Sequence, residues 1–191
     1  MRRLILASGS PRRQELLQSV GADFVVDPSQ ASEEVEGAMH PAELVQVLAL
    51  RKAAEVAARY SDGLVIGSDT IVALGDEVMG KPKDEADARR MLLRLSGHTH
   101  QVHTGVAIID AASAKKQVAA ECTQVTMRPI SLDEVERYIA TGEPRDKAGA
   151  YAIQGRACLF ITGIDGCYFN VVGLPLQRLN TMLREFGVDL L

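Results

Sequence analysis

The sequence has no tryptophan and only four tyrosines and four phenylalanines. With so few rings, a folded core must be built mainly from aliphatic side chains, which the 47% hydrophobic content supplies. Cysteine is scarce as well. Cys122, Cys158 and Cys167 form no Cys-x-x-Cys pair, and their odd number disfavours a disulfide framework. We interpret them as buried small hydrophobic residues in a reducing compartment.

Long hydrophobic runs are also missing. The uncharged stretch Gly166–Gln177 is interrupted by Asn170 and Pro175, whereas a membrane-spanning helix needs about 20 apolar residues. After Met1-Arg2-Arg3, the apolar run Leu4–Ala7 is far too short for the core of a signal peptide. The sequence therefore predicts a soluble, cytoplasmic protein with no membrane partner.

Basic residues are not in excess. Lys and Arg total 21 against 25 Asp and Glu, which gives a formal net charge of −4. Nucleic-acid binding generally requires a basic surface, so we expect no nucleic-acid partner. A basic pocket in one part of the surface is compatible with this balance. The length of 191 residues and the absence of repeats, low-complexity segments or linkers predict a single domain over residues 1–191.

Short apolar runs alternate irregularly with amphipathic helical patterns. Strands are expected at residues 4–6, 24–26, 64–66, 70–74, 98–109, 117–127, 157–162 and 167–172, the last two as a hairpin. Helices are expected at residues 11–20, 41–60, 85–95 and 132–141 and from residue 176 onward, with Asp84 and Ser131 as N-caps. The pattern predicts an α/β fold with a mixed sheet.

Ser8-Gly9-Ser10-Pro11-Arg12-Arg13 joins the first expected strand to the first helix. Two arginines in the first turn lie at the positive end of the helix dipole, which is unfavourable. A bound anion would reverse that effect and use the free backbone N–H groups, and guanidinium groups suit phosphate oxygens. The alternative is a solvated helix end with surface arginines.

Asp69 follows Gly67-Ser68 between two strongly apolar runs. A carboxylate there is costly unless a cation, hydrogen-bond donors or a catalytic role offsets the cost. The alternative is a simple turn at Gly67. Lys52 falls in the apolar stripe of the helix expected over 41–60. Its ammonium either reaches solvent past that stripe or points into a pocket.

Two further segments could contact a ligand. Gly80-Lys81-Pro82-Lys83 is a stiffened basic loop, with a solvated loop as its alternative. Residues 146–155 combine small side chains with Gln154, whose carboxamide could read a base edge. A glycine-rich turn is the other interpretation. His98, His100 and His103 have no nearby Cys or carboxylate to complete a shell, so no zinc site is predicted.

Six segments carry a family resemblance. They are Leu6-Ala7-Ser8-Gly9-Ser10-Pro11-Arg12-Arg13, Gly67-Ser68-Asp69-Thr70, Gly80-Lys81-Pro82, Ser96-Gly97-His98, Asp146-Lys147-Ala148-Gly149-Ala150-Tyr151 and Gly173-Leu174-Pro175. In this order they resemble the motifs of the Maf-like nucleoside triphosphate pyrophosphatases, over nearly the whole chain. The resemblance implies a twisted mixed sheet flanked by helices, with two lobes around a nucleotide-binding cleft, related to the inosine triphosphate pyrophosphatases.

The resemblance also implies a reaction in which water attacks the α-phosphorus of a nucleoside triphosphate and pyrophosphate leaves. Asp69 matches the family's catalytic carboxylate, which accepts the proton of the attacking water. The matching phosphate-binding positions are Ser8, Arg13, Lys52 and Lys81. The family depends on a divalent cation, Mg²⁺ or Mn²⁺. Glu33, the first of the pair Glu33-Glu34, matches the acid that helps to hold it beside Asp69.

Arg12, Thr70 and Gln154 match the subgroup that prefers dTTP and UTP over 7-methyl-GTP. The resemblance therefore implies a hydrolase of nucleotide metabolism that cleans the nucleotide pool. A link to arrest of cell division and a homodimer are further expectations from the family. Two alternatives stay open: a non-catalytic nucleotide sensor, which would release no pyrophosphate, and a phosphomonoesterase, which would release orthophosphate.

Overall fold

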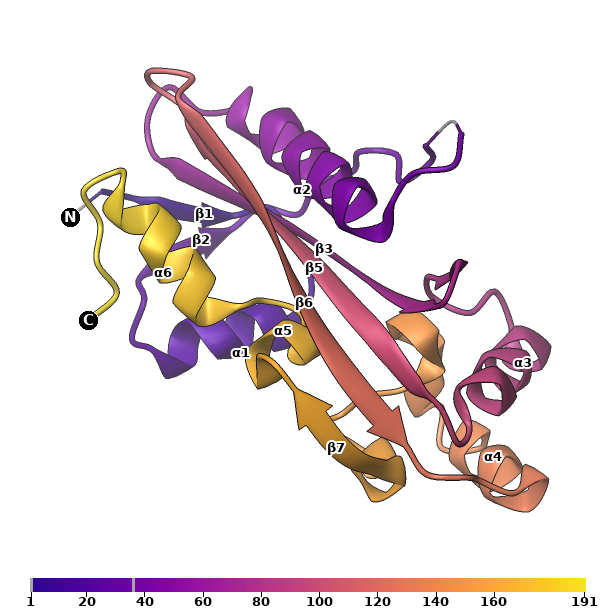
Figure 1. The fold of residues 1–191 in the computed structure, drawn as a ribbon. Helices are drawn as coiled ribbons and strands as arrows, with labels where there is room; N and C mark the ends of the chain where they lie inside the picture. The colour runs from indigo at the N-terminus through magenta and orange to yellow at the C-terminus, as the bar shows by residue number, and fades with distance from the viewer. Residues whose placement is uncertain (1, 36) are drawn as a thin grey trace. The chain divides into compact units, whose positions relative to one another are not determined.

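The computed structural model describes residues 2–35 and 37–191, which form a mixed α/β fold (Figure 1). The strands are β1 (Leu4–Leu6), β2 (Phe24–Val26), β3 (Leu64–Leu74), β4 (Glu77–Met79), β5 (Thr99–Asp110), β6 (Lys116–Met127) and β7 (Ile161–Asp165). The α-helices are α1 (Pro11–Ser19), α2 (Pro41–Ala57), α3 (Glu85–Leu95), α4 (Leu132–Ile139), α5 (Tyr168–Val172) and α6 (Leu176–Arg184). Three short 3-10 helices are η1 (Glu143–Asp146), η2 (Ala148–Ala150) and η3 (Arg156–Phe160). The fold class predicted from the sequence is confirmed.

The strands form one sheet in the order β2-β1-β3-β5-β6-β7, and β4 pairs with β3. β1 is parallel to both of its neighbours, with Leu4 opposite Phe24 on β2 and opposite Leu64 on β3. β4 is antiparallel to β3, and β7 is antiparallel to β6. Parallel neighbours need a crossover, which α1 and α2 supply, whereas β3 and β4 are joined by a tight turn.

The chain divides into two compact units. The first comprises residues up to Asp69 together with 104–121 and 173–191, and the second comprises 70–103 and 122–172. The strands β3, β5 and β6 each continue from one unit into the other. That residues 1–191 act as a single domain stays a prediction.

In the first unit, α2 covers one face of the sheet, and α1 and α6 lie on the other (Figure 1). The core beneath α2 is aliphatic, as the composition predicts, and consists of Ile5, Ala7, Ala49, Ala53, Val56, Val65, Ala107 and Ile109. Two glycines let the helix lie directly on the strands. A Cβ atom at Gly67 of β3 would be 2.2 Å from the Ala49 carbonyl oxygen, and one at Gly105 of β5 would be 2.1 Å from the Val45 carbonyl oxygen.

In the second unit, α3 and α4 pack together against the short 3-10 helices. Both helices begin as the sequence predicts. The Asp84 carboxylate accepts a hydrogen bond of 2.8 Å from the Asp87 N–H. Ser131 and Glu134 form a reciprocal capping box at the start of α4. The buried side chains of the two helices are Ala88, Met91, Leu92, Leu95, Val135, Tyr138 and Ile139.

Three local expectations were wrong. The cysteines are not buried: Cys122 and Cys158 are exposed, and Cys167 is half-buried. Residues 64–74 form one uninterrupted strand, because the side chains of Ser68 and Asp69 find partners within the fold. The expected hairpin of strands 157–162 and 167–172 does not form: residues 156–160 are 3-10 helix and 168–172 are α-helix. A short apolar run cannot by itself distinguish a strand from a buried helical turn.

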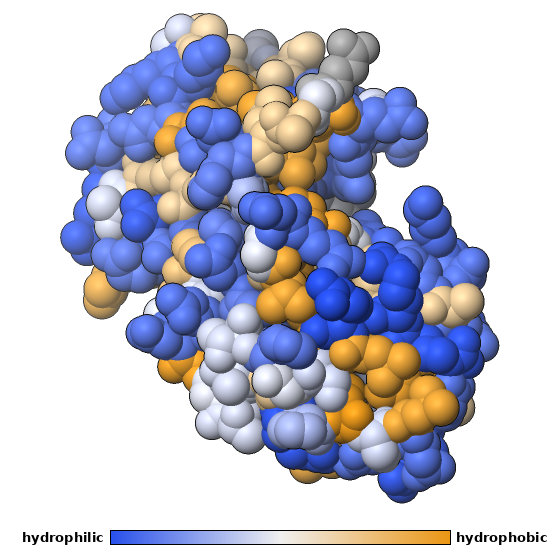
Figure 2. All heavy atoms as spheres, turned by 45° about the vertical axis from the view of Figure 1, so that its right-hand side comes forward, coloured by the Kyte–Doolittle hydropathy of each residue, from blue (hydrophilic) through white to orange (hydrophobic). Residues whose placement is uncertain are grey.

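The face of the molecule in Figure 2 is mostly hydrophilic, with hydrophobic patches between the polar side chains. Within residues 2–35 and 37–191, no helix is both long enough and apolar enough to cross a membrane.

Candidate functional site

The loop between β1 and α1 brings Ser8 and Arg13 together. The buried Ser8 hydroxyl accepts hydrogen bonds from the Arg13 Nη1 at 3.0 Å and from the Ser10 N–H at 3.3 Å. Ser10 is the N-cap residue of α1 but makes no side-chain capping hydrogen bond, and Pro11 fills the first helical position, where the helix was expected to begin. The first turn of α1 therefore presents Arg13 next to the Ser8 loop.

The Arg13 guanidinium also contacts a segment that lies far away in the sequence. Its Nε donates a hydrogen bond of 2.8 Å to the Gly173 carbonyl oxygen, which also accepts one of 3.2 Å from the Ser68 hydroxyl. Burial lowers the pKa of the Arg13 guanidinium, and the Asp69 carboxylate opposes that effect. A guanidinium remains charged at neutral pH, so Arg13 is a fixed and partly desolvated cation.

Lys52 lies between two carboxylates. Its Nζ is 2.6 Å from Asp69 Oδ1 and 2.6 Å from Glu33 Oε1. The Lys52 and Asp69 side chains are only 13% and 10% exposed, while that of Glu33 is 55% exposed. The Lys52 ammonium is therefore largely shielded and faces Asp69, instead of extending past the apolar stripe into open solvent.

The position of Asp69 follows from the packing of α2 on β3. The absence of a Cβ at Gly67 lets the helix backbone approach the strand at Ala49 and Ala53. Lys52, one residue before Ala53, then reaches Asp69, two residues beyond Gly67. The strand thus carries a buried carboxylate with an ammonium partner, which offsets much of the cost of burying its charge.

Glu33 and Asp69 form a set of oxygen donors that fits a divalent cation. Because both oxygens lie 2.6 Å from the same nitrogen, they are separated by at most twice that distance. Mg²⁺ commonly binds one or two carboxylates and completes its shell with water and phosphate oxygens. In residues 2–35 and 37–191, no group of three or more His, Cys, Asp or Glu side chains gathers into a metal site. The pair suits a cation shared with a phosphate ligand better than a closed protein cage.

The remaining site candidates are divided between the two units. Arg12 lies next to Arg13 on α1 in the first unit and is half-buried. Thr70 follows Asp69 directly on β3 and is the first residue of the second unit. Lys81 and Gln154 are exposed residues of the second unit, Lys81 in the loop before α3 and Gln154 in the turn between η2 and η3.

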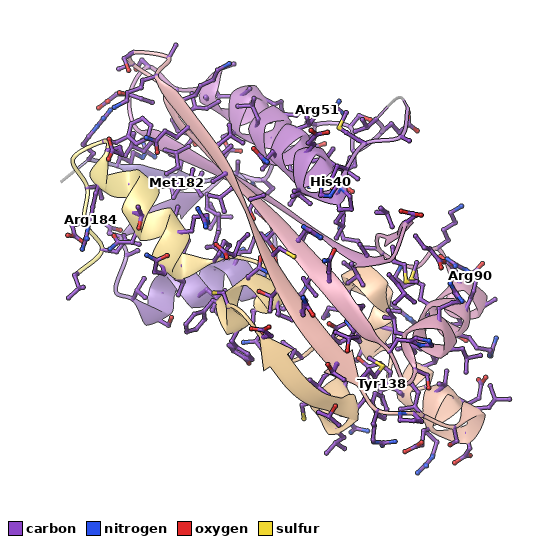
Figure 3. The ribbon with its side chains drawn as sticks, in the orientation of Figure 1. His40, Arg51, Arg90, Tyr138, Met182 and Arg184 are labelled. Carbon is purple, nitrogen blue, oxygen red and sulfur yellow. The ribbon has the colours of Figure 1, made fainter. Side chains whose placement is uncertain are left out.

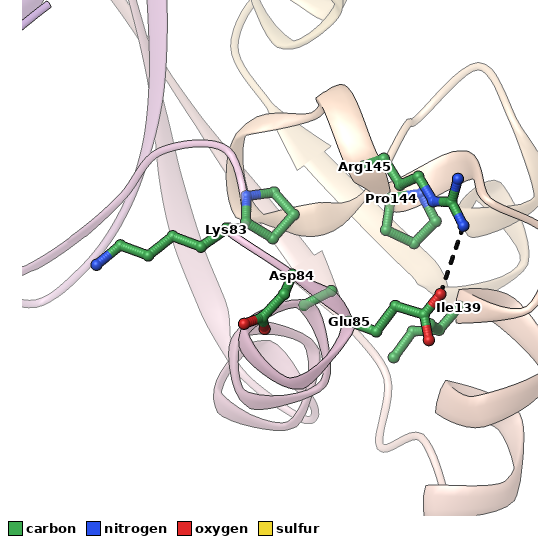
Figure 4. A pocket seen from close by; sticks show the side chains of 8 residues that line it. Lys83, Asp84, Glu85, Ile139, Pro144 and Arg145 are labelled. Atoms are coloured by element: carbon green, nitrogen blue, oxygen red, sulfur yellow. Dashed lines mark hydrogen bonds and ion pairs between the residues drawn. The ribbon is translucent and has the colours of Figure 1, made fainter.

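A pocket of about 340 Å³ lies in the second unit beside the Lys81 loop (Figure 4). Its lining consists of Pro82, Lys83, Asp84, Glu85, Ala88, Ile139, Pro144 and Arg145. Glu85 and Arg145 face each other across it at 3.5 Å, whereas the Lys83 side chain extends away from both. Two of its charged groups, Glu85 and Arg145, thus pair with each other, and Pro82, Ala88, Ile139 and Pro144 add apolar lining.

The three clustered histidines differ in their exposure. His98 precedes β5 and is exposed, while His100 and His103 are both buried. The His100 Nε2 lies 2.8 Å from the Tyr151 hydroxyl, and burial lowers the pKa of His100 to about 4. His100 is a neutral core residue at pH 7.

Sequence reasoning assigned no role to the Gly173 carbonyl. Gly173 was noted only within a motif, yet its backbone oxygen joins Arg13 of α1 to Ser68 of β3. Its φ of +125° is one that glycine tolerates best. An isolated Gly before Leu174-Pro175 is the only local signal, and it does not reveal the partners.

The sequence was compared with known proteins. Residues 3–186 match the model of a family described as Maf-like protein. A dTTP/UTP pyrophosphatase of Pelotomaculum thermopropionicum is 53% identical over 191 residues, covering 100% of both chains. A dTTP/UTP pyrophosphatase of Symbiobacterium thermophilum is 54% identical over 187 residues, covering 98% of this chain and 95% of the relative.

Among solved structures, the Staphylococcus aureus Ham1 protein is similar with a TM-score of 0.55 and 12% identity, over 97% of this chain and 100% of the other. A HAM1 protein from Coxiella burnetii is similar with a TM-score of 0.54 and 13% identity, with the same coverage. At such low identity the likeness shows a shared fold.

Proposed function

Because this chain belongs to the Maf-like protein family, we propose that it hydrolyses dTTP and UTP to the monophosphate and pyrophosphate. Full-length relatives about half identical in sequence are named dTTP/UTP pyrophosphatase. One observation carries the proposal at the level of residues. Lys52 is held between Glu33 and Asp69, and Arg13, which contacts Ser8, feels the charge of the same Asp69 carboxylate. Cations for phosphate and a carboxylate for water therefore lie in one unit.

The triphosphate is bound by cations and a hydroxyl. The Arg13 guanidinium can donate to two phosphate oxygens at once, and the Ser8 hydroxyl beside it adds a further donor. Lys52 supplies a point charge, and the family resemblance adds Lys81 as a further phosphate-binding residue. Phosphoryl transfer needs positioning and charge stabilisation more than a covalent nucleophile, and these residues provide both.

Asp69 accepts a proton from the attacking water. The water oxygen forms a bond to the α-phosphorus while the bond from that phosphorus to the bridging oxygen breaks. Pyrophosphate leaves with that bonding electron pair, and the proton released by the water goes to an Asp69 carboxylate oxygen. Asp69 is almost fully buried and fixed by Lys52, which holds the carboxylate in place for this transfer.

A divalent cation, Mg²⁺ or Mn²⁺, fits Glu33 and Asp69 in this proposal. When bound, it would neutralise charge on the phosphate oxygens and lower the pKa of nearby water. Lys52 Nζ contacts both carboxylates and also carries the charge that a phosphate oxygen prefers. The same ammonium can therefore hold the acidic pair together and contact the triphosphate.

Base selectivity belongs to Arg12, Thr70 and Gln154. Uracil and thymine present O4 as an acceptor and N3–H as a donor, and the Gln154 carboxamide can satisfy both. The Thr70 hydroxyl, directly after Asp69, adds a second polar contact. Cytosine reverses the pattern, so a fixed set of contacts rejects it.

The setting of the reaction is also part of the proposal. The protein would act in the cytoplasm as a homodimer that clears unwanted pyrimidine triphosphates and influences cell division. Light scattering on the purified protein measures the assembly, and a monomer at micromolar concentration would remove the dimer from the proposal.

The decisive experiment measures pyrophosphate and orthophosphate release from a panel of nucleoside triphosphates, with and without Mg²⁺. The proposal expects pyrophosphate, dependence on the cation, and dTTP and UTP ahead of other substrates. Binding without product would indicate a nucleotide sensor. Orthophosphate as the first product would indicate a phosphomonoesterase and overturn the reaction.

A further inference from the structure

Gln154 lies in a tight turn that is closed by a backbone hydrogen bond. The Gly155 N–H donates a hydrogen bond of 3.0 Å to the Ala152 carbonyl oxygen, which places Ile153 and Gln154 at the two central positions. Ile153 is buried and Gln154 is exposed. The turn therefore anchors one central side chain in the core and presents the other outward.

Both ends of this turn are tied to one pair of side chains, Tyr138 and Glu143. The Ala152 N–H donates to the Tyr138 hydroxyl at 3.1 Å, and that hydroxyl donates to Glu143 Oε1 at 2.8 Å. The other carboxylate oxygen, Oε2, accepts from the Arg156 N–H at 3.1 Å. Three hydrogen bonds thus link the residue before the turn to the residue after it.

We call Tyr138 and Glu143, with their hydrogen bonds to the two ends of the turn, the clasp. Gly155 provides the space for it. A Cβ at Gly155 would lie 2.2 Å from Glu143 Oε1 and 2.5 Å from Oε2. Real Cβ atoms do not approach other atoms so closely, so any side chain at this position would displace the carboxylate. The glycine directly after Gln154 is therefore required by the contact that fixes the turn.

Tyr138, one of the two clasp residues, is itself fixed by packing. Tyr138 projects from α4 and is 3% exposed (Figure 3). Its ring packs edge to face on Phe160 with centroids 5.4 Å apart. Burial, with the Glu143 carboxylate as a further cause, raises the pKa of Tyr138, so the hydroxyl stays protonated and able to donate.

We propose that Tyr138 and Glu143 are positioning residues for base selectivity, because they fix the turn that presents the Gln154 carboxamide. This inference rests on the proposed function, in which Gln154 reads the pyrimidine edge. A fixed carboxamide discriminates between uracil and cytosine, whereas a loosely held turn lets the amide shift and accept either pattern. The pair touches no substrate and acts through the orientation of Gln154 alone.

The test compares four variants with the wild type. Tyr138→Phe keeps the ring and removes the hydroxyl shared by Ala152 and Glu143. Glu143→Gln keeps the shape, but its amide can accept only one of the two donors. Gln154→Glu replaces the carboxamide that is proposed to contact the base. Glu136→Gln is the matched control on the helix that carries Tyr138, because it weakens the ion pair with Arg89 of α3 without touching the turn.

Two quantities are measured: kcat/KM for dTTP, UTP and dCTP, and amide hydrogen exchange of Ala152 and Arg156 in the substrate-free protein. Tyr138→Phe and Glu143→Gln should lower the preference for dTTP over dCTP by about tenfold, the lower range for one mispaired polar contact. The loss should appear mainly as a higher KM for dTTP. Both amides should exchange faster, and Glu136→Gln should change neither quantity.

The outcomes separate the two proposals. A wild type that prefers dTTP, with variants that keep this preference while the two amides exchange faster, would overturn the positioning role and leave the function standing. Unchanged amide exchange in both variants would overturn it too. A wild type without preference for dTTP and UTP would overturn the proposed selectivity, and this inference with it.

Discussion

Lys52 on α2 and Asp69 on β3 are in direct contact, with Lys52 Nζ 2.6 Å from Asp69 Oδ1, although 17 positions separate them in the chain. The contact depends on Gly67, where a side chain would strike the backbone of α2. Helix, strand and glycine together place a cation on a buried carboxylate.

The first prediction concerns this carboxylate. Asp69→Asn keeps the size of the side chain but removes the charge that holds Lys52 and accepts the proton. We expect kcat for dTTP to fall by at least about a hundredfold, the usual scale for loss of a general base. Steady-state pyrophosphate release measures the effect, and circular dichroism checks the fold. Turnover close to that of the wild type would exclude Asp69 from the mechanism.

The second prediction distinguishes two of the three proposed phosphate-binding cations, Lys81 and Arg13. Lys81 is exposed, so Lys81→Ala should raise KM for dTTP without changing the free energy of unfolding. Arg13→Ala should raise KM for dTTP and also lower the free energy of unfolding, because it removes the partner of the Gly173 carbonyl and of Ser8. Urea unfolding and kinetics on the same samples measure this. Lys116→Ala, on the exposed start of β6, is the control that should change neither.

The third prediction concerns the packing of α2. Gly67→Ala should destabilise the protein by roughly 1–3 kcal/mol, the usual cost of forcing atoms into a packed core. Gly163→Ala on β7 is the matched control, because no atom lies within 4 Å of the added Cβ. Urea unfolding compares the two. Equal stability of both variants would mean that α2 does not need its close approach at Gly67.

The fourth prediction is a pH dependence. Burial lowers the pKa of His100 from 6.5 to about 4, so between these values the unfolded chain binds the proton and the folded protein does not. The free energy of unfolding should therefore fall as the pH falls from about 6.5 to 4, with the full contribution present above 6.5. His100→Gln should flatten this part of the profile. Urea unfolding at several pH values tests it, and an unchanged slope in the variant would contradict it.

Local patterns in the sequence determined the ends of several helices and the general fold class. The caps at Asp84 and Ser131 involve residues only three positions apart, so the sequence contains both partners of each hydrogen bond. The family resemblance implied one site that includes Ser8, Arg13, Lys52, Asp69 and Lys81, and the roles of these residues stay predictions. The aliphatic composition predicted a core with few aromatic side chains.

Tertiary structure decided the rest. Whether residues 67–69 interrupt the strand depended on partners elsewhere in the chain, and so did the helix at 168–172, where the Asn170 carboxamide donates to the Val102 carbonyl. The Arg13 contact with Gly173 joins residues 160 positions apart. Side chains that far apart meet only when helices and strands pack. Local propensity depends on the neighbours of a residue along the chain. These contacts depend instead on which residues are neighbours in space.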